Sequence, residues 1–246
     1  MLYDENNPHH YYAKPGTPLH QLGIPSDSGF EEQQDYSCTE GNVEVIFRNF
    51  KRRLIGEILR YPVVLGCVAW LTDRDVLAAL AGRESVSIIV QKEDFLRPDL
   101  GKSDNANAKL QQLYGQMPGI CRQEMQGIAP GLNYCGDPDT EGVRCVGNHN
   151  SDYRPAVPRM HNKFLVFCSK VPSGDPALYD TITPHSVWTG SFNVTEAGGY
   201  SWENAVIIRS YAIALAYAKE HAQLLALSEE LDWKRPWVTP EYRIGS

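Results

Sequence analysis

An unbroken apolar run at residues 63–71, VVLGCVAWL, constrains the fold more than any other feature of the chain. A run without polar alternation is typical of a central strand that is covered on both faces. The neighbouring patterns predict strands at 43–47 and 85–91 and helices at 50–59 and 74–81. This order of strands and helices predicts an α/β fold, with a mixed, largely parallel central sheet flanked by helices.

The later part of the chain continues this pattern less regularly. Thr72 and Asp75 resemble a capping box in front of the helix at 74–81. A long segment at 117–150, rich in Gly, Pro, Asn and Asp, predicts a loop, and loops of that length are often functional. The remaining expected elements are a helix at 106–114, strands at 163–168, 186–189 and 204–208, and a closing helix at 211–231.

Composition divides the chain of 246 residues into two parts. Residues 1–42 hold seven acids against one lysine and show no helical or strand period, which predicts a flexible acidic arm. Residues 43–246 predict one domain with a sizeable core. No apolar run reaches the roughly 18 residues that span a bilayer, and the start of the chain lacks a secretory pattern. We therefore expect a cytoplasmic protein without stable membrane insertion.

Charge within the predicted domain is concentrated in one segment. Residues 143–170 hold five basic side chains against one acid, although the whole chain has a net charge of −7. A basic segment in an acidic chain favours a ligand that bears phosphate over a general polyanion-binding surface.

Six cysteines raise the question of disulfides or a metal. Without a secretory signal, we expect free thiols rather than disulfides. Cys121, Cys135, Cys145 and His149 could supply four zinc ligands from one loop. Their spacing lacks the two-residue knuckle of ordinary zinc modules, so the alternative of unligated side chains stays open.

A histidine and a lysine stand two positions apart at the start of the strand expected at 163–168. Alternate side chains of a strand share a face, so His161 and Lys163 should point the same way. The plain alternative is a polar strand entrance without chemistry.

Two further segments carry polar side chains suited to phosphate. In Gly190-Ser-Phe-Asn193 the glycine permits a close backbone approach, and the hydroxyl of Ser191 and the amide of Asn193 can bind phosphate oxygens. Glu203 stands directly before the strand expected at 204–208, which begins with Asn204, and a carboxylate there could orient a histidine. Either segment alone is also compatible with a simple loop.

Together and in this order, the three segments resemble the phospholipase D superfamily and its HKD motif. The resemblance covers roughly residues 43–246, is strongest over 159–209, and is closest to short bacterial members with one motif copy per chain, the Nuc-type endonucleases. It implies an α-β-α sandwich and a metal-independent phosphodiesterase without cofactors. It also assigns catalysis to His161, Lys163, Asn193 and Glu203, with Ser191, Gly190 and Arg159 binding substrate.

The resemblance further implies a covalent phosphohistidine on His161. A second histidine must then protonate the leaving oxygen and later activate water. Only one His-Xaa-Lys is present, so we expect a homodimer in which a second copy supplies that histidine. Glu203 would hold His161 in one tautomer.

One position departs from the motif, because Cys168 stands where the family has an aspartate. In the family this aspartate is thought to support the fold more than the reaction, so we expect a divergent subfamily. Nucleic acid, DNA or RNA, is the expected substrate. The alternatives are phospholipase D or cardiolipin-synthase-type lipid transfer, for which an exposed apolar rim is expected and not evident in the sequence, and a non-catalytic binding protein.

Overall fold

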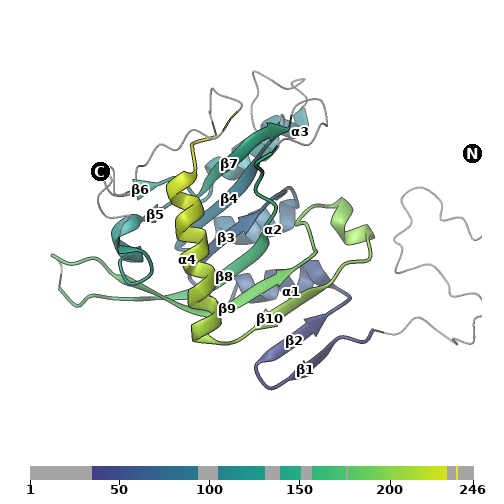
Figure 1. Ribbon diagram of the computed structural model, residues 1–246, viewed down its shortest axis with the longest axis horizontal. Helices are drawn as coiled ribbons and strands as arrows, with labels where there is room; N and C mark the ends of the chain where they lie inside the picture. The colour runs from purple at the N-terminus through teal and green to yellow at the C-terminus, as the bar shows by residue number, and fades with distance from the viewer. Residues whose placement is uncertain are drawn as a thin grey trace, which may run out of the picture.

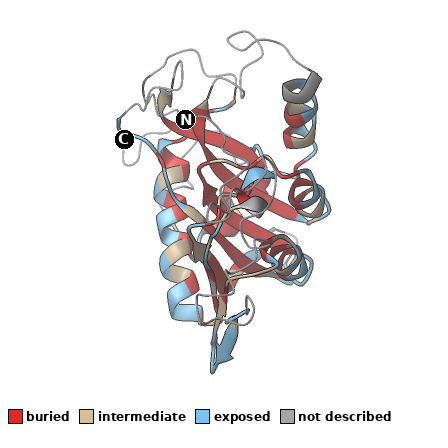
Figure 2. Cartoon of the chain, turned by 90° about the vertical axis from the view of Figure 1, so that its right-hand side faces the viewer, coloured by how far each residue is buried: buried red, intermediate tan, exposed pale blue. Residues whose placement is uncertain are grey.

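The chain folds as three layers in the computed structural model, which describes residues 35–93, 105–130, 139–150, 157–175, 177–231 and 237. An eight-stranded sheet forms the middle layer. Helix α4 covers one face, and α1, α2 and α3 cover the other (Figures 1 and 2). The helices are α1 (Phe50–Ile58), α2 (Arg74–Ala81), α3 (Asn105–Gly115) and α4 (Tyr211–Leu227), with short 3-10 turns η3 (Arg122–Met125) and η6 (Ala197–Tyr200).

The sheet has the strand order β1-β2-β10-β9-β8-β3-β4-β7. Its strands are β1 (Cys38–Glu40), β2 (Val43–Ile46), β3 (Val63–Val68), β4 (Ser85–Glu93), β7 (Val143–Asn150), β8 (Lys163–Val171), β9 (Thr181–Gly190) and β10 (Ala205–Ile208). A separate hairpin joins β5 (Ile120–Cys121) and β6 (Asp139–Thr140).

The mixed α/β class is confirmed, but the parallel part of the sheet is smaller than the sequence predicts. Among the described strands, only the pairs β3–β4 and β4–β7 are parallel. The other five neighbouring pairs are antiparallel. The reason is that β8, β9 and β10 follow one another through loops and a 3-10 turn, and only parallel neighbours need a helical crossover.

Alternation along the central strands builds two hydrophobic cores. In β8, Leu165 and Phe167 belong to the core under α1, α2 and α3, whereas Phe164, Val166 and Cys168 belong to the core under α4. All five side chains are buried. The opposite faces predicted for this strand are therefore confirmed, and β8 provides a rigid support for the residues at its start.

Three local predictions need correction. The side chain of Asp73, not Thr72, caps α2, because it accepts hydrogen bonds from the backbone N–H groups of Asp75 and Val76. β7 lies inside the segment expected to be a loop. Its Gly147, at φ +93°, interrupts the residue pattern by which a strand is recognised in the sequence. β1 lies within the expected arm, whose residues 1–34 are outside the described residues.

Membrane-spanning helices were also sought. In the part of the chain that the structure describes, no helix combines the length and the apolar character needed to cross a bilayer.

Candidate active site

The three predicted polar segments meet at one end of the sheet. β8 is paired antiparallel with β9 so that Phe164 faces Thr189, and β9 is paired antiparallel with β10 so that Gly190 faces Ala205. The start of β8, the end of β9 and the start of β10 therefore lie side by side. Segments that are separated by up to 40 residues in sequence are joined here by strand register alone.

Gly190 is required by the close approach of β10. A Cβ atom at this position would lie 2.2 Å from the carbonyl oxygen of Asn204 and 2.7 Å from the Cα of Ala205. Both are backbone atoms that cannot rotate away. The contact is sealed by two hydrogen bonds of 3.0 Å, from the Ser191 N–H to the Asn204 carbonyl and from the Asn204 N–H to the Ser191 Oγ.

The loop after β9 is anchored to the opposite layer. The ring of Phe192 is buried and stacks on Phe50 of α1, with the ring centroids 5.2 Å apart. Two residues after Phe192, the carbonyl oxygen of Val194 accepts hydrogen bonds from the backbone N–H groups of Thr72 and Asp73. Asn193 lies between these two anchors, so its position is fixed by packing rather than by its own side chain.

His161 and Lys163 lie in contact, as their alternation in sequence predicts. The Lys163 Nζ is 3.3 Å from each ring nitrogen of His161 and donates to the His161 carbonyl oxygen at 3.0 Å. The ring of Trp70 meets the imidazole edge-on, with centroids 5.4 Å apart, and its indole N–H donates to Glu93 at 2.9 Å. The imidazole is therefore exposed but bordered by a cation and an aromatic ring.

The surroundings favour the neutral form of His161. Partial burial, then the charges of Lys163 and Arg159, lower the pKa of His161 below its ordinary value. Partial burial also lowers the pKa of Lys163; the Glu203 carboxylate raises it, and Arg159 lowers it further. A neutral imidazole beside a lysine is a competent nucleophile near pH 7.

These side chains line a pocket of about 570 Å³. His161, Lys163, Gly190, Ser191 and Asn193 all contribute to its wall. The Oδ1 atom of Asn193 is buried and accepts no hydrogen bond from the residues that the structure describes. A buried amide oxygen without a partner is costly, and such atoms gather at functional sites.

Glu203 is near the pocket but does not touch the histidine. Its carboxylate accepts a hydrogen bond from the Ser191 hydroxyl, and its charge acts on Lys163. Within the described chain, the hydrogen-bond contacts of His161 are all with Lys163. The expected contact between Glu203 and His161 is thus not made in this structure.

The basic segment 143–170 does not form one surface. Arg144 is buried, pairs with Glu141 and donates to Ser228, and Lys170 pairs with Glu124 at 2.6 Å. Arg159 is exposed and acts electrostatically on the histidine. Of the described basic side chains in this segment, Lys163 lines the pocket and Arg159 acts on His161 by its charge; Arg154 lies outside the described residues.

The suggested zinc ligands are not brought together. Cys135 lies outside the described residues. Cys145 is buried in β7 and its thiol contacts the carbonyl oxygen of Glu230, while Cys121 belongs to the small hairpin and contacts Gln123. Across the described ranges, no three His, Cys, Asp or Glu side chains, His149 included, gather as metal ligands.

Cys168 is fully buried in the core under α4. Burial raises the pKa of its thiol, and no charged group contributes to that shift. Cys168 therefore belongs to the packing of β8 and not to the pocket. Asp180, in the loop between β8 and β9, accepts a hydrogen bond from the Ser173 N–H.

Sequence reasoning missed three side chains at the site. Trp70 is the last but one residue of the apolar run at 63–71 and carries no polar signal, yet it borders His161. Tyr217 and Glu220 of α4 line the pocket, although they lie about 55 residues from the motif. Only the tertiary packing of α4 across the sheet could reveal them.

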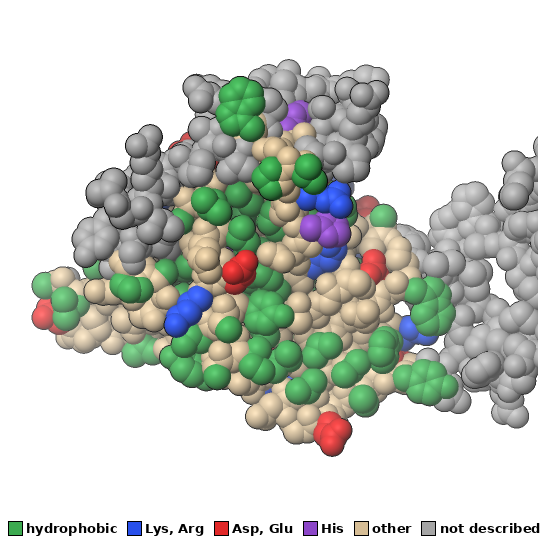
Figure 3. All heavy atoms as spheres, in the orientation of Figure 1, with side chains coloured by type: hydrophobic (Ala, Val, Ile, Leu, Met, Phe, Trp, Pro, Cys, Tyr) green, Lys and Arg blue, Asp and Glu red, His purple; other side chains and the backbone are tan. Residues whose placement is uncertain are grey.

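Several large apolar side chains are exposed before β10 and at the start of α4, where the sequence pattern indicates no clear apolar rim. Trp202, Tyr211 and Ile213 are 54%, 58% and 40% exposed. Figure 3 shows hydrophobic side chains gathered over the N-terminal half of α4, below the cluster of histidine and basic side chains. Arg48 covers one side of the Trp202 ring at 4.2 Å.

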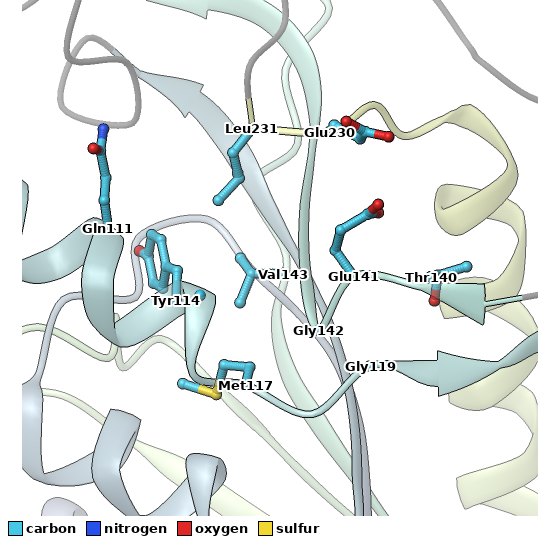
Figure 4. Close-up of a pocket in the computed structure, with 11 residues that line it drawn as sticks. Gln111, Tyr114, Met117, Gly119, Thr140, Glu141, Gly142, Val143, Glu230 and Leu231 are labelled. Atoms are coloured by element: carbon cyan, nitrogen blue, oxygen red, sulfur yellow. The ribbon is translucent and has the colours of Figure 1, made fainter.

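A second cavity, of about 470 Å³, lies away from these residues (Figure 4). Tyr114, Met117, Val143 and Leu231 give it a largely apolar wall. The Tyr114 hydroxyl donates to the Leu71 carbonyl, and burial raises its pKa, so it is not available as an acid or base. This cavity lacks the nucleophile and cations that the first pocket combines.

Comparison with known proteins gives one relative in sequence. No family model matches the chain. Uncharacterized protein L381 of Acanthamoeba polyphaga mimivirus is 27% identical over 204 residues, covering 80% of this chain and 69% of that protein.

Solved structures with a similar course of chain include one described as a phospholipase D family member. Nuc from Salmonella typhimurium, a phospholipase D family member, gives a TM-score of 0.44 at 17% identity over 78% of this chain and 97% of its own. NucT from Helicobacter pylori gives a TM-score of 0.44 at 14% identity, over 76% of this chain and 98% of its own. Phosphatidylserine synthase from Haemophilus influenzae gives a TM-score of 0.39 at 14% identity, over 79% of this chain and 42% of its own. All three TM-scores lie below 0.5, and the α/β class rests on the strand order and layers of this chain.

Proposed function

We propose that this chain is a phospholipase D superfamily member that cleaves nucleic-acid phosphodiesters without a metal. The observation that carries the proposal is the pocket in which His161 and Lys163 lie in contact beside Ser191 and Asn193. It combines an exposed nucleophile with a cation and neutral donors at the end of a rigid sheet.

In the first step a ring nitrogen of neutral His161 attacks phosphorus. A nitrogen–phosphorus bond forms as the bond to the leaving oxygen breaks, and an imidazolium gives that oxygen its proton. The lowered pKa of His161 favours the attacking form. Lys163 and the Asn193 amide stabilise charge on the phosphoryl oxygens, and a donor of this kind is worth about 3 kcal/mol.

In the second step water attacks the phosphohistidine. The imidazole left neutral by the first step takes the water proton, the nitrogen–phosphorus bond breaks, and His161 is regenerated with its electron pair. The chemistry thus needs two imidazoles in one site.

A homodimer would supply the second imidazole. A two-fold axis beside the pocket places His161 of each copy opposite the other. It could also cover the exposed apolar side chains of Tyr211 and Ile213, which are costly to leave in water and lie on α4, the helix whose Tyr217 and Glu220 line the pocket. These exposed side chains support a second copy as the partner of the site.

A lipid phosphodiester is the second candidate substrate. The exposed apolar side chains at the start of α4 favour it, because such side chains could enter the interface of a bilayer. Nucleic acid remains the preferred substrate, since Arg159 and Lys163 supply positive charge at the mouth and the motif resembles the single-copy endonucleases.

The test compares single-stranded DNA, duplex DNA, RNA and phosphatidylcholine vesicles with the full chain and with His161→Ala. We expect hydrolysis of nucleic acid that survives EDTA, a phosphoenzyme trapped by acid quench, and loss of both in the variant. Cleavage confined to vesicles would replace the nuclease by the lipid enzyme. Binding of nucleic acid without turnover would favour a non-catalytic protein, and loss of activity in EDTA would refute the mechanism.

Sedimentation tests the dimer separately. We expect the active species to sediment as two chains, and Ile213→Glu on the apolar surface to give inactive monomers. Lys219→Glu, also on α4 and exposed, is the matched control. An active monomer would refute the shared site.

A further inference from the structure

A groove of about 330 Å³ runs between α1 and the β2–β10 edge, on the face of the sheet opposite α4. Ionic side chains dominate its wall, in contrast to the apolar cavity of Figure 4. It is lined by four arginines and two glutamates: Arg52, Arg53, Arg60, Arg209, Glu44 and Glu57.

The two glutamates each hold two arginines. The Glu44 carboxylate accepts from Arg53 at 2.7 Å and from Arg209 at 2.9 Å. Glu57 is buried and pairs with Arg60 at 3.0 Å and with Arg209 at 3.5 Å. Although burial raises the pKa of Glu44, the hydrogen bonds from Arg209 and Arg53 bring it below its ordinary value.

The groove therefore carries more positive than negative charge. Four guanidinium groups face two carboxylates, which leaves a formal excess of two positive charges. Arg52 has no hydrogen bond or ion pair with any residue that the structure describes. A guanidinium presents five N–H donors in a fixed fork, so these arginines retain donors for a further acceptor.

A glycine keeps the groove open. Gly56 lies in the interior of α1, one helical turn after Arg52 on the same face. A Cβ at Gly56 would meet no atom within 4 Å, so packing does not require the glycine. Glycine costs about 1 kcal/mol relative to alanine inside a helix. At this position the missing side chain leaves room between Arg52 and Arg60.

We propose that this groove binds a small phosphate-bearing anion with two negative charges, a phosphate monoester or a diphosphate. The fork of a guanidinium matches two phosphate oxygens, and the excess of two charges matches a dianion. The volume lies at the lower end of small-ligand pockets, which suits a single phosphorylated group. The site does not depend on the chemistry proposed for His161.

The test is calorimetric titration of the full chain with inorganic phosphate, pyrophosphate, AMP, glycerol phosphate and a 5′-phosphorylated dinucleotide. These ligands distinguish a free anion, a nucleotide, a lipid headgroup and a nucleic-acid end as the source. Each titration is repeated in Lys163→Ala, so that binding in the candidate active site is separated from binding in the groove. We expect one site to remain in that variant.

Two variants act on the groove in different ways. Arg52→Gln removes an exposed charge without a partner, and Gly56→Leu fills the groove without changing charge. We expect each to weaken phosphate binding at least tenfold, since one charge-assisted hydrogen bond is worth this much. Arg74→Gln, an exposed arginine on α2 outside the groove, should bind as the parent does.

Several results would overturn the proposal. They are the absence of binding by every phosphate in the Lys163→Ala chain, equal binding by Arg52→Gln and its parent, and succinate binding as tightly as phosphate. Thermal denaturation of each variant checks folding. If Arg52→Gln does not fold, Gly56→Leu decides the question alone, because leucine, like alanine, is more favourable than glycine inside a helix.

Discussion

Replacing Cys168 with aspartate should strongly destabilise the chain, although it restores the residue that the HKD motif carries. Cys168 is fully buried between Val166 and the strand β9, in the apolar core under α4. Burial alone raises the pKa of its thiol, and no cation among the described residues contributes to that shift. An aspartate here would have to be buried without a counter-ion.

The cost follows from the pKa that such a carboxyl would adopt. An unfolded aspartate has a pKa of about 3.9, and full burial raises it by about 3 to 5 units. The folded pKa is then about 7 or higher, above the unfolded value, so the unfolded state ionises first and gains stability as pH rises. The penalty reaches about 4 kcal/mol at pH 7 and about 1.5 kcal/mol at pH 5. Whole domains are stable by only about 5–15 kcal/mol.

Urea denaturation followed by circular dichroism measures this penalty, with Cys168→Asn as the matched control. Asparagine has the same shape as aspartate without the charge, so the difference between the two variants isolates the ionisation term. We expect that difference to shrink as pH falls from 7 to 5. Equal stability of the two variants at pH 7 would show that water or a cation reaches position 168, and would refute the reasoning.

Three further predictions concern the site and the core. Gly190→Ala should cost about 1–3 kcal/mol of unfolding free energy and lower phosphodiester hydrolysis about 100-fold, because β10 must move. Gly127→Ala, whose Cβ meets no neighbour, is the control. Equal stability and activity of the two variants would contradict this prediction. Burial lowers the pKa of His221 to about 4, below the ordinary 6.5, so the unfolded state takes up the proton first as pH falls. The unfolding free energy should therefore fall by roughly 3 kcal/mol between pH 6.5 and 4. In urea denaturation, His221→Gln should make this loss smaller. Arg159→Gln should raise the pKa of His161 toward its ordinary value and move the acidic limb of kcat/KM to higher pH, and an unchanged imidazole titration by NMR would contradict the charge effect.

The sequence predicts the parts of the fold that depend on local pattern. The helix α2 begins and ends where its spacing predicts, and the two faces of β8 follow from alternation. The strand direction was not predictable, since it depends on which strands become neighbours. β7 was missed because Gly147 and polar residues interrupt its apolar positions, and its pairing with β4 supplies the energy that local propensity lacks.

The site, too, has a part that the sequence predicts and a part that it does not. His161, Lys163, Ser191 and Asn193 share one pocket because strand register brings motif segments together, and the motif order already encodes that register. Trp70 and the α4 side chains could not be predicted, because their place depends on layers packing across the sheet. The basic segment does not act as one unit, since Arg144 and Lys170 are used in internal ion pairs.

The hydrogen bonds of His161 bear on the proposal that one chain holds half of a site. An ammonium group can only donate, so Lys163 must meet a ring nitrogen that carries a lone pair. The other nitrogen of a neutral imidazole carries a proton and needs an acceptor. Glu203 is engaged with Ser191, and no other acceptor reaches His161 in the described part of the chain. We therefore expect the acceptor that fixes the tautomer to arrive with substrate or with a second copy, which is also where the proposed reaction needs its second imidazole.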